Sequence, residues 1–314
     1  MKQGFEQLKK TTQFFFFLIL LLTFMVAAIF IGRAPLSEFV MVYLRVPRIL
    51  MSVFAGASLA LCGAIFQTIF RNPICDPYIL GISSGASIGA ALAFILGLDF
   101  YLFGVTSFAL LTAFVTLLLM LGIMQLSKIK SSYIMLLAGI SLNFLMASLL
   151  TLLIVLNHQE MQKIIFWTMG SFATVSYYDL YFFIPIFLLS AFFILLLSKD
   201  LNIMQLGNTQ AQTLGVNTQK ITYITLFLSS ILIAATVSIC GVIGFIGLIV
   251  PHLVRIIWGN NTKTLFVFSI LLGAIFMLLA DTMSRTVVIN SELPVGSITA
   301  LIGTPYFIYM LLKK

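Results

Sequence analysis

Apolar runs of membrane-spanning length, separated by short polar breaks, make up most of this sequence. A helix needs about 20 apolar residues to cross a bilayer, and runs close to that length recur from Phe14 to Leu312. The pattern predicts a single all-α, polytopic membrane domain over residues 1–314. We expect about ten spans, at residues 14–31, 47–70, 78–97, 103–126, 133–156, 180–198, 221–240, 242–258, 264–284 and 295–312.

Small residues recur at every fourth position in two of these runs. Such faces let helix backbones approach one another closely inside a membrane. The two sets are Gly56, Ala60 and Ala64, and Gly81, Gly85 and Gly89.

The longest polar interruption is residues 199–220, KDLNIMQLGNTQAQTLGVNTQK. It has no aromatic residue and no proline, and two similar pieces recur in it, QLG at 205–207 and TLG at 213–215. The segment divides the apolar runs into two parts. We expect one or two short helices that fit a groove on a partner protein. An ordinary solvated connector is the alternative.

The composition excludes a soluble protein and gives no sign of catalysis. The chain is 61% hydrophobic and 8% charged, whereas soluble domains have about 25% charged residues. No phosphate-binding loop and no HExxH motif occurs. Cys62, Cys75 and Cys240 are too far apart for a metal pair or a disulfide framework. We therefore expect no enzyme activity, no metal and no cofactor on this chain.

The net charge of +8 comes from basic residues scattered singly between apolar runs. That pattern fits the positive-inside rule better than a nucleic-acid site. With ten spans, alternate loops divide the 17 basic residues unequally. The richer side, which we expect to be cytoplasmic together with both termini and residues 199–220, has Lys2, Lys9, Lys10, Arg71, Lys128, Lys130, Lys199, Lys220, Arg255, Lys263, Lys313 and Lys314; the other has Arg33, Arg45, Arg48, Lys163 and Arg285.

Ionisable residues are scarce within the predicted spans. Asp281 is the one acidic residue there, and it lies four positions before Arg285 on the same helix face, so we expect a local ion pair. Ion-coupled carriers usually need carboxylates or broken-helix ion sites in the membrane. An ion-coupled secondary transporter is therefore the weaker alternative, and energy is expected to come from another chain.

Four stretches resemble permeases of the FecCD/BtuC type, the membrane subunits of type II ABC importers for iron–siderophore, haem and cobalamin. The resemblance covers almost the whole chain, in the family's order and spacing. The stretches are RVPR at 45–48, GASLALCGAIFQTIFRNPICDPYILGISSGASIG at 56–89, GVIGFIGLIVPHLVR at 241–255 and SELPVGSITALIG at 291–303.

The resemblance implies an inverted-repeat fold of ten helices in the bacterial cytoplasmic membrane, with two permease subunits, identical or related, around one pathway. ATP and Mg would be bound by separate ATPase subunits. Residues 199–220 would be the coupling loop that docks the ATPase. The matching positions are Gln205, Leu206, Gly207, Ala211, Leu214 and Gly215.

The resemblance also assigns roles at the two membrane surfaces. Arg45, Arg48 and Arg285 would receive acidic side chains of an extracytoplasmic binding protein, since arginine can hold a carboxylate with two hydrogen bonds; anchoring of helix ends at the headgroups is the alternative. The family's cytoplasmic gate positions correspond to Asn72, Ile74, Ser131 and Ser132. The alternative is that these residues only cap helix ends and form turns.

The implied function is import of an iron complex, a siderophore or haem, from the binding protein into the cytoplasm. A cobalamin importer of the same fold is the alternative. No set of polar residues in the sequence distinguishes these substrates.

Overall fold

The computed structural model describes residues 2–32, 37–101, 103–126, 132–288 and 291–312. Within these residues the chain is helical and has no strand. The elements in order are α1 (Lys2–Phe30), a π-helical segment (Val40–Arg45) that continues into α2 (Val46–Ile69), a 3-10 turn (Pro77–Leu80), α3 (Ile82–Ile95), a 3-10 turn (Leu98–Phe100), α4 (Gly104–Leu126), α5 (Ser132–Leu156), α6 (Met161–Thr168), α7 (Tyr177–Leu196), α8 (Ser198–Met204), α9 (Asn208–Thr213), α10 (Thr218–Cys240), α11 (Ile246–Trp258), α12 (Thr262–Thr286) and α13 (Val295–Leu312).

Seven of the described helices are long and apolar enough to cross a membrane: α1, α2 with its π-helical start, α4, α5, α7, α10 and α12. The three other predicted spans coincide with the shorter apolar helices α3, α11 and α13. The all-helical membrane class predicted from the pattern is thus confirmed. The count of ten spans is not established by length and hydropathy alone.

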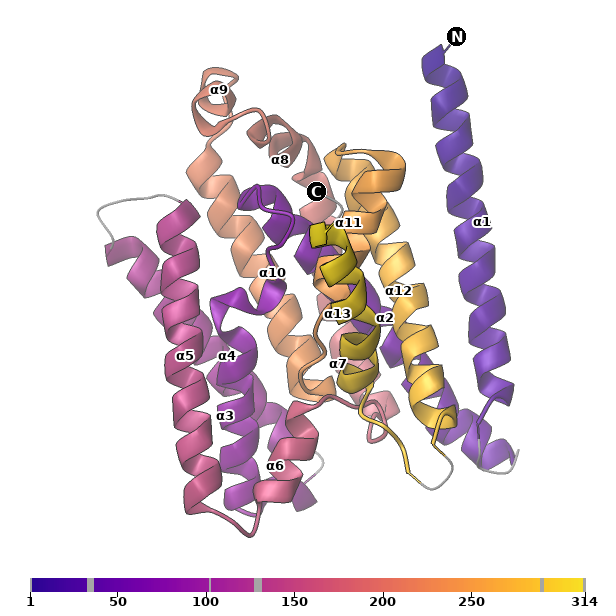
Figure 1. Cartoon of the computed structure of the whole chain (residues 1–314), viewed down its shortest axis with the longest axis vertical. Helices are drawn as coiled ribbons and strands as arrows, with labels where there is room; N and C mark the ends of the chain where they lie inside the picture. Colours follow the sequence, from indigo (N-terminus) through magenta and orange to yellow (C-terminus); the bar gives the residue numbers. More distant parts are fainter. Residues whose placement is uncertain (1, 33–36, 102, 127–131, 289–290, 313–314) are drawn as a thin grey trace.

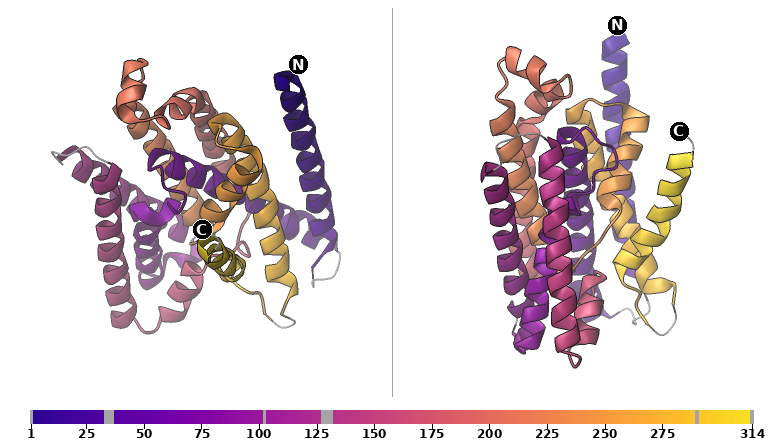
Figure 2. Two further views of the ribbon diagram at one scale, coloured as in Figure 1. Left: turned by 45° about the horizontal axis from the view of Figure 1, so that its top comes forward. Right: turned by 60° about the vertical axis from the view of Figure 1, so that its left-hand side comes forward.

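Helix α2 is the centre of the bundle. In its most apolar stretch 89% of the residues are buried, against 11% in α1. Helices α10, α11 and α12 pack around α2, while α1 and α5 lie on opposite flanks (Figures 1 and 2). Apolar side chains on the flanking helices, such as Phe16 and Leu152, are exposed. Apolar side chains exposed on the outer helices are expected where a protein contacts the hydrocarbon core of a bilayer.

Glycines bring α2 into backbone contact with its neighbours. Gly56 meets Gly273 of α12, and Gly63 meets Gly247 of α11; in both pairs an added Cβ would overlap the facing carbonyl group. On α3, a Cβ at Gly85 would overlap the side chain of Thr116 on α4. The predicted small-residue faces are therefore packing faces.

The short helices α3 and α11 each follow an irregular backbone segment. Residues 70–81 precede α3, with Arg71 at φ 48° and Gly81 at φ 77°. Residues 241–245 precede α11, and Phe245 there has φ 70°. The segments meet at Tyr78, whose hydroxyl donates to the Ile243 carbonyl at 2.9 Å and accepts from the Ile243 amide at 3.2 Å. These bonds satisfy backbone groups that a continuous helix would have paired.

Candidate functional site

The polar interruption folds into the α8–α9 segment, residues 198–217, at one end of the bundle (Figure 1). It forms two short helices, as the sequence predicted, with the turn between them at Gly207, whose φ of 134° is open only to glycine. The start of α1 and the end of α13 lie at this same end (Figures 1 and 2). We refer to it as the α8–α9 end.

Two leucines of the α8–α9 segment point outward. Leu206 is 63% exposed and Leu214 is 61% exposed, each next to a glycine of positive φ, Gly207 or Gly215. Among the other candidate docking residues, Ala211 is completely buried and the amide of Gln205 points inward. The segment therefore presents an apolar pair on a polar, solvated turn.

Hydrogen bonds attach the α8–α9 segment to two other parts of the bundle. Arg71, just after α2, donates from Nη2 to the Met204 carbonyl and to Asn208 Oδ1, both at 2.7 Å. Gln205 Nε2 donates to Thr262 Oγ1 at 2.7 Å and to the Asn260 carbonyl at 3.1 Å. The segment is thus joined to the end of α2 and to the α11–α12 turn.

Two of the candidate gate residues directly follow Arg71. Asn72 is exposed, and its Oδ1 accepts from the Ile74 amide at 3.0 Å, which closes a tight turn; Ile74 is 40% exposed. Farther along, Asp76 Oδ1 accepts from the Tyr78 amide at 2.8 Å.

The side-chain contacts of the two other candidate gate residues, Ser131 and Ser132, are not described. Ser131 lies outside the described residues. Ser132 is the first residue of α5, and its side chain is also outside the description.

A polar pocket of about 300 Å³ lies behind the α8–α9 segment. Arg255 of α11 donates into its wall, from Nη2 to Thr68 Oγ1 at 3.0 Å. Its lining residues are Gln67, Thr68, Arg71, Pro73, Gln205, Arg255 and Asn260.

The opposite end of the bundle holds a cluster of charged side chains. Arg48, in the first turn of α2, donates from Nε to Asp281 Oδ1 and from Nη1 to Glu292 Oε2, both at 2.8 Å. Arg285 Nε lies 3.2 Å from Asp281 Oδ2. Arg45 is also buried and donates from Nη1 to the Ile29 carbonyl at the end of α1, at 2.7 Å. We call Arg45, Arg48, Asp281, Arg285 and Glu292 the arginine cluster.

The structure brings the three candidate binding-protein arginines together, and all three are more than 90% buried. The predicted pairing of Asp281 with Arg285 is confirmed. The sequence did not indicate that Asp281 also binds Arg48, which is 233 positions away, or that Glu292 belongs to the cluster. Contacts between residues so far apart in the chain leave no periodic pattern in the sequence.

Several donors of the cluster have no hydrogen-bond partner among the described residues. Arg48 Nη2 and Arg285 Nη1 are buried and unpaired there. An unpaired buried donor costs free energy, so a carboxylate oxygen that reached these N–H groups would accept hydrogen bonds from them favourably.

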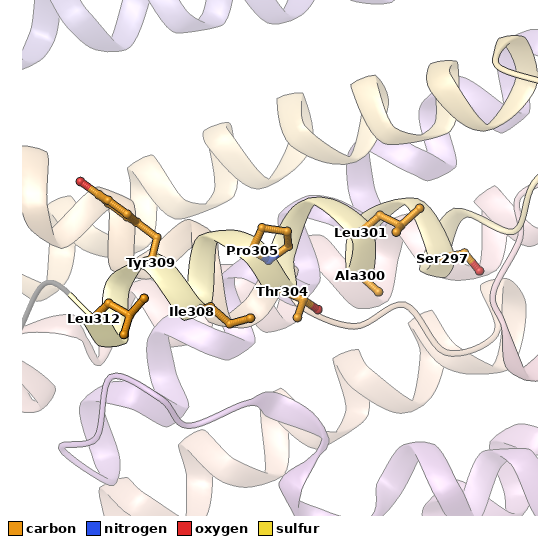
Figure 3. Close-up of a pocket in the computed structure, with 8 residues that line it drawn as sticks. All are labelled: Ser297, Ala300, Leu301, Thr304, Pro305, Ile308, Tyr309 and Leu312. Atoms are coloured by element: carbon orange, nitrogen blue, oxygen red, sulfur yellow. The ribbon is translucent and has the colours of Figure 1, made fainter.

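Helix α13 exposes one long face, along which a groove of about 810 Å³ runs (Figure 3). Leu301 and Tyr309 are more than half exposed. The hydroxyls of Ser297 and Thr304 lie on the same face as these apolar side chains. A purely lipid-facing helix would not need them.

The described residues contain no group of three or more His, Cys, Asp or Glu side chains placed to hold a metal ion. Cys62, Cys75 and Cys240 are buried free thiols.

Comparisons with known proteins cover almost the full chain. The model of the FecCD transport family matches residues 10–313. The molybdate import system permease protein MolB of Haemophilus influenzae is 39% identical over 87% of this chain and 81% of its own. The hemin transport system permease protein HmuU of Yersinia pestis is 37% identical over 86% and 82%. A solved structure described as an inward-facing conformation of a metal-chelate type ABC transporter has a TM-score of 0.89 and 36% identity, over 97% of this chain and 100% of that one.

Proposed function

The chain belongs to the FecCD transport family and is a permease subunit of an ABC importer rather than an enzyme, and we propose that it carries an iron complex, a siderophore or haem, into the cytoplasm. The similarity to HmuU, named for hemin, supports this substrate class. MolB, named for molybdate, is equally similar in extent, so the substrate needs a direct test.

In the proposed topology all ten apolar helices cross the membrane, and the α8–α9 end faces the cytoplasm together with both termini. Helix α3 has 14 residues and spans only about 21 Å, which is short of a bilayer core of about 30 Å. The irregular segments before α3 and α11 supply the missing length. Their matching positions in the two halves support an inverted repeat.

The exposed pair Leu206 and Leu214 is the observation that carries the assignment of an ATPase-coupled permease. In an ABC importer, ATP and Mg are bound by a separate ATPase, so the permease must offer that subunit a docking surface. An apolar pair on turns that Gly207 and Gly215 make possible through their positive φ can insert into a groove. Gln205 and Ala211 would hold this surface in shape from behind.

Arg71 would transmit movement of the docked segment to the gate. It holds the α8–α9 turn through two short hydrogen bonds, and the chain continues from it directly into Asn72 and Ile74. A shift of the turn would therefore displace these gate residues, with Ser131 and Ser132 completing the gate.

At the far end, the arginine cluster would receive the extracytoplasmic binding protein. Arg48, Arg285 and Arg45 outnumber the two acids of the cluster, Asp281 and Glu292, so it attracts carboxylates. A second permease subunit would pack across the pathway from α13, whose mixed apolar and hydroxyl face suits a translocation pathway better than lipid.

The docking surface is tested by purifying the permease with its ATPase after Leu206→Asp and Leu214→Asp are introduced together. Burying two carboxylates in an apolar groove is costly, so we expect the ATPase to be lost from the complex. Leu126→Asp, at a leucine that ends α4 and is 86% exposed, is the control and should keep it. Retention of the ATPase by the double variant would refute the docking surface.

The substrate is tested by ATP-driven uptake into vesicles that contain the complete transporter. We expect uptake of a ferric siderophore or haem. Uptake of molybdate or cobalamin alone would refute the iron-complex assignment and leave the permease assignment intact.

A further inference from the structure

We propose that Glu292 occupies, in the undocked permease, the place on Arg48 that a carboxylate of the binding protein takes on docking. The proposal rests on the proposed docking role of the arginine cluster. It makes Glu292 a placeholder that keeps Arg48 oriented and paired until the partner arrives.

The two acids on Arg48 differ in exposure. The side chain of Asp281 is 0% exposed, whereas that of Glu292 is 49% exposed, although both lie 2.8 Å from the same guanidinium. Removing one partner of a buried ion pair shifts an equilibrium by more than about 100-fold. An exposed pair contributes no more than about fivefold. Asp281 is therefore a permanent partner of Arg48, and Glu292 is a replaceable one.

The hydrogen bonds of Arg48 favour the replacement. Nε is taken by Asp281 and Nη1 by Glu292, while Nη2 has no partner among the described residues. A carboxylate that approaches the end of the guanidinium can accept from Nη1 and Nη2 together, in the bidentate geometry that arginine prefers. The incoming group would thus satisfy a donor that Glu292 leaves unpaired.

Glu292 can leave without disturbing the fold. The next residue, Leu293, is held by its amide, which donates to the Ser284 carbonyl at 3.2 Å, and by its carbonyl, which accepts from Ser284 Oγ at 2.6 Å. The amide of Val295 donates to the Gly170 carbonyl at 3.0 Å. Because these bonds fix the backbone on the C-terminal side, a rotation of the Glu292 side chain is enough to free Arg48.

The test measures the affinity of the purified binding protein for the permease–ATPase complex in lipid nanodiscs. We expect Glu292→Gln to tighten docking up to about fivefold, because the competing carboxylate is gone. The control is Glu160→Gln. Glu160 is a partly exposed acid at the same end of the bundle and is paired with Lys163 at 2.9 Å, so its loss changes the net charge equally without touching Arg48.

The outcomes test two claims separately: that Glu292 is a placeholder, and that the arginine cluster is the docking site. Unchanged or weaker docking of Glu292→Gln would overturn the placeholder, and so would equal tightening by Glu160→Gln, which would show a general charge effect. Arg48→Glu is measured alongside them. If it docks normally, the arginine cluster is not the docking site; if it alone loses docking while Glu292→Gln is unchanged, only the placeholder fails.

Discussion

In the proposed function, each end of the bundle presents a surface to a partner, and the two surfaces differ in their chemistry. At the α8–α9 end, neutral hydrogen bonds and Arg71 fix a turn that exposes Leu206 and Leu214. At the other end, charged groups are withdrawn into the protein, and only Glu292 of the arginine cluster is exposed. The first surface suits a lasting apolar contact, and the second suits a reversible ionic one.

Helix α2 connects these ends. Arg48 lies in its first turn and Arg71 lies two residues after its last. Between them, Gly56 and Gly63 hold α2 against α12 and α11 at backbone distance. A displacement at one end can therefore reach the other along a closely packed helix.

The largest effect is expected from Asp281→Ala, which leaves Arg48 and Arg285 buried without their shared carboxylate. The cost is about 3–5 kcal/mol. We expect most of the purified protein to aggregate on mild heating, as measured by size-exclusion chromatography in detergent. Glu292→Gln is the matched control within the same cluster and should behave like the wild type. Equal stability of the two variants would remove the distinction between permanent and replaceable partners.

A smaller effect is expected from Arg71→Gln, which removes both hydrogen bonds to the α8–α9 turn. One of these bonds is exposed to solvent, so we expect a total loss near the lower end of the about 1.5–3 kcal/mol of a bond from a charged donor. Uptake should then fall about tenfold while the ATPase still copurifies. Lys9→Gln, at an exposed basic residue near the start of α1 at the same end, should leave uptake unchanged. Normal uptake by the Arg71 variant would show that movement reaches the gate by another route.

The smallest effect is expected from Gly63→Ala, whose methyl group would overlap the Gly247 carbonyl. Overpacking of this kind costs about 1–3 kcal/mol, and we expect a lower thermal midpoint and slower uptake. At Gly122 of α4 nothing lies within 4 Å of an added Cβ, so Gly122→Ala should be neutral or slightly stabilising. If the two variants behave alike, the close packing of α2 does not matter for transport.

The periodic features of the fold could be predicted from the sequence, because hydropathy and small-residue spacing report on each helix separately. The predicted spans coincide with described helices, and one or two short helices were expected in the polar segment, where the structure has two. Their ends were less predictable: α1 begins at Lys2 and α10 at Thr218, since polar residues continue a helix readily. The irregular segments before α3 and α11 depend on tertiary contacts such as that of Tyr78 with Ile243.

The candidate site could be predicted only in part. Arg45, Arg48 and Arg285 were identified by resemblance, and the structure groups them. Their burial, and the membership of Glu292, arise from contacts between residues far apart in the chain, which no local pattern reports. The same is true of the joint between Arg71 and the α8–α9 turn.

The most direct test of the account is a crossed binding measurement on the reconstituted permease, in which ATPase binding and binding-protein docking are both measured for two variants. For the double variant Leu206→Asp with Leu214→Asp, we expect loss of the ATPase with binding-protein docking retained. For Arg48→Glu, we expect loss of binding-protein docking with the ATPase retained. If each variant loses both partners, or if the losses are exchanged, the assignment of one partner to each end is wrong.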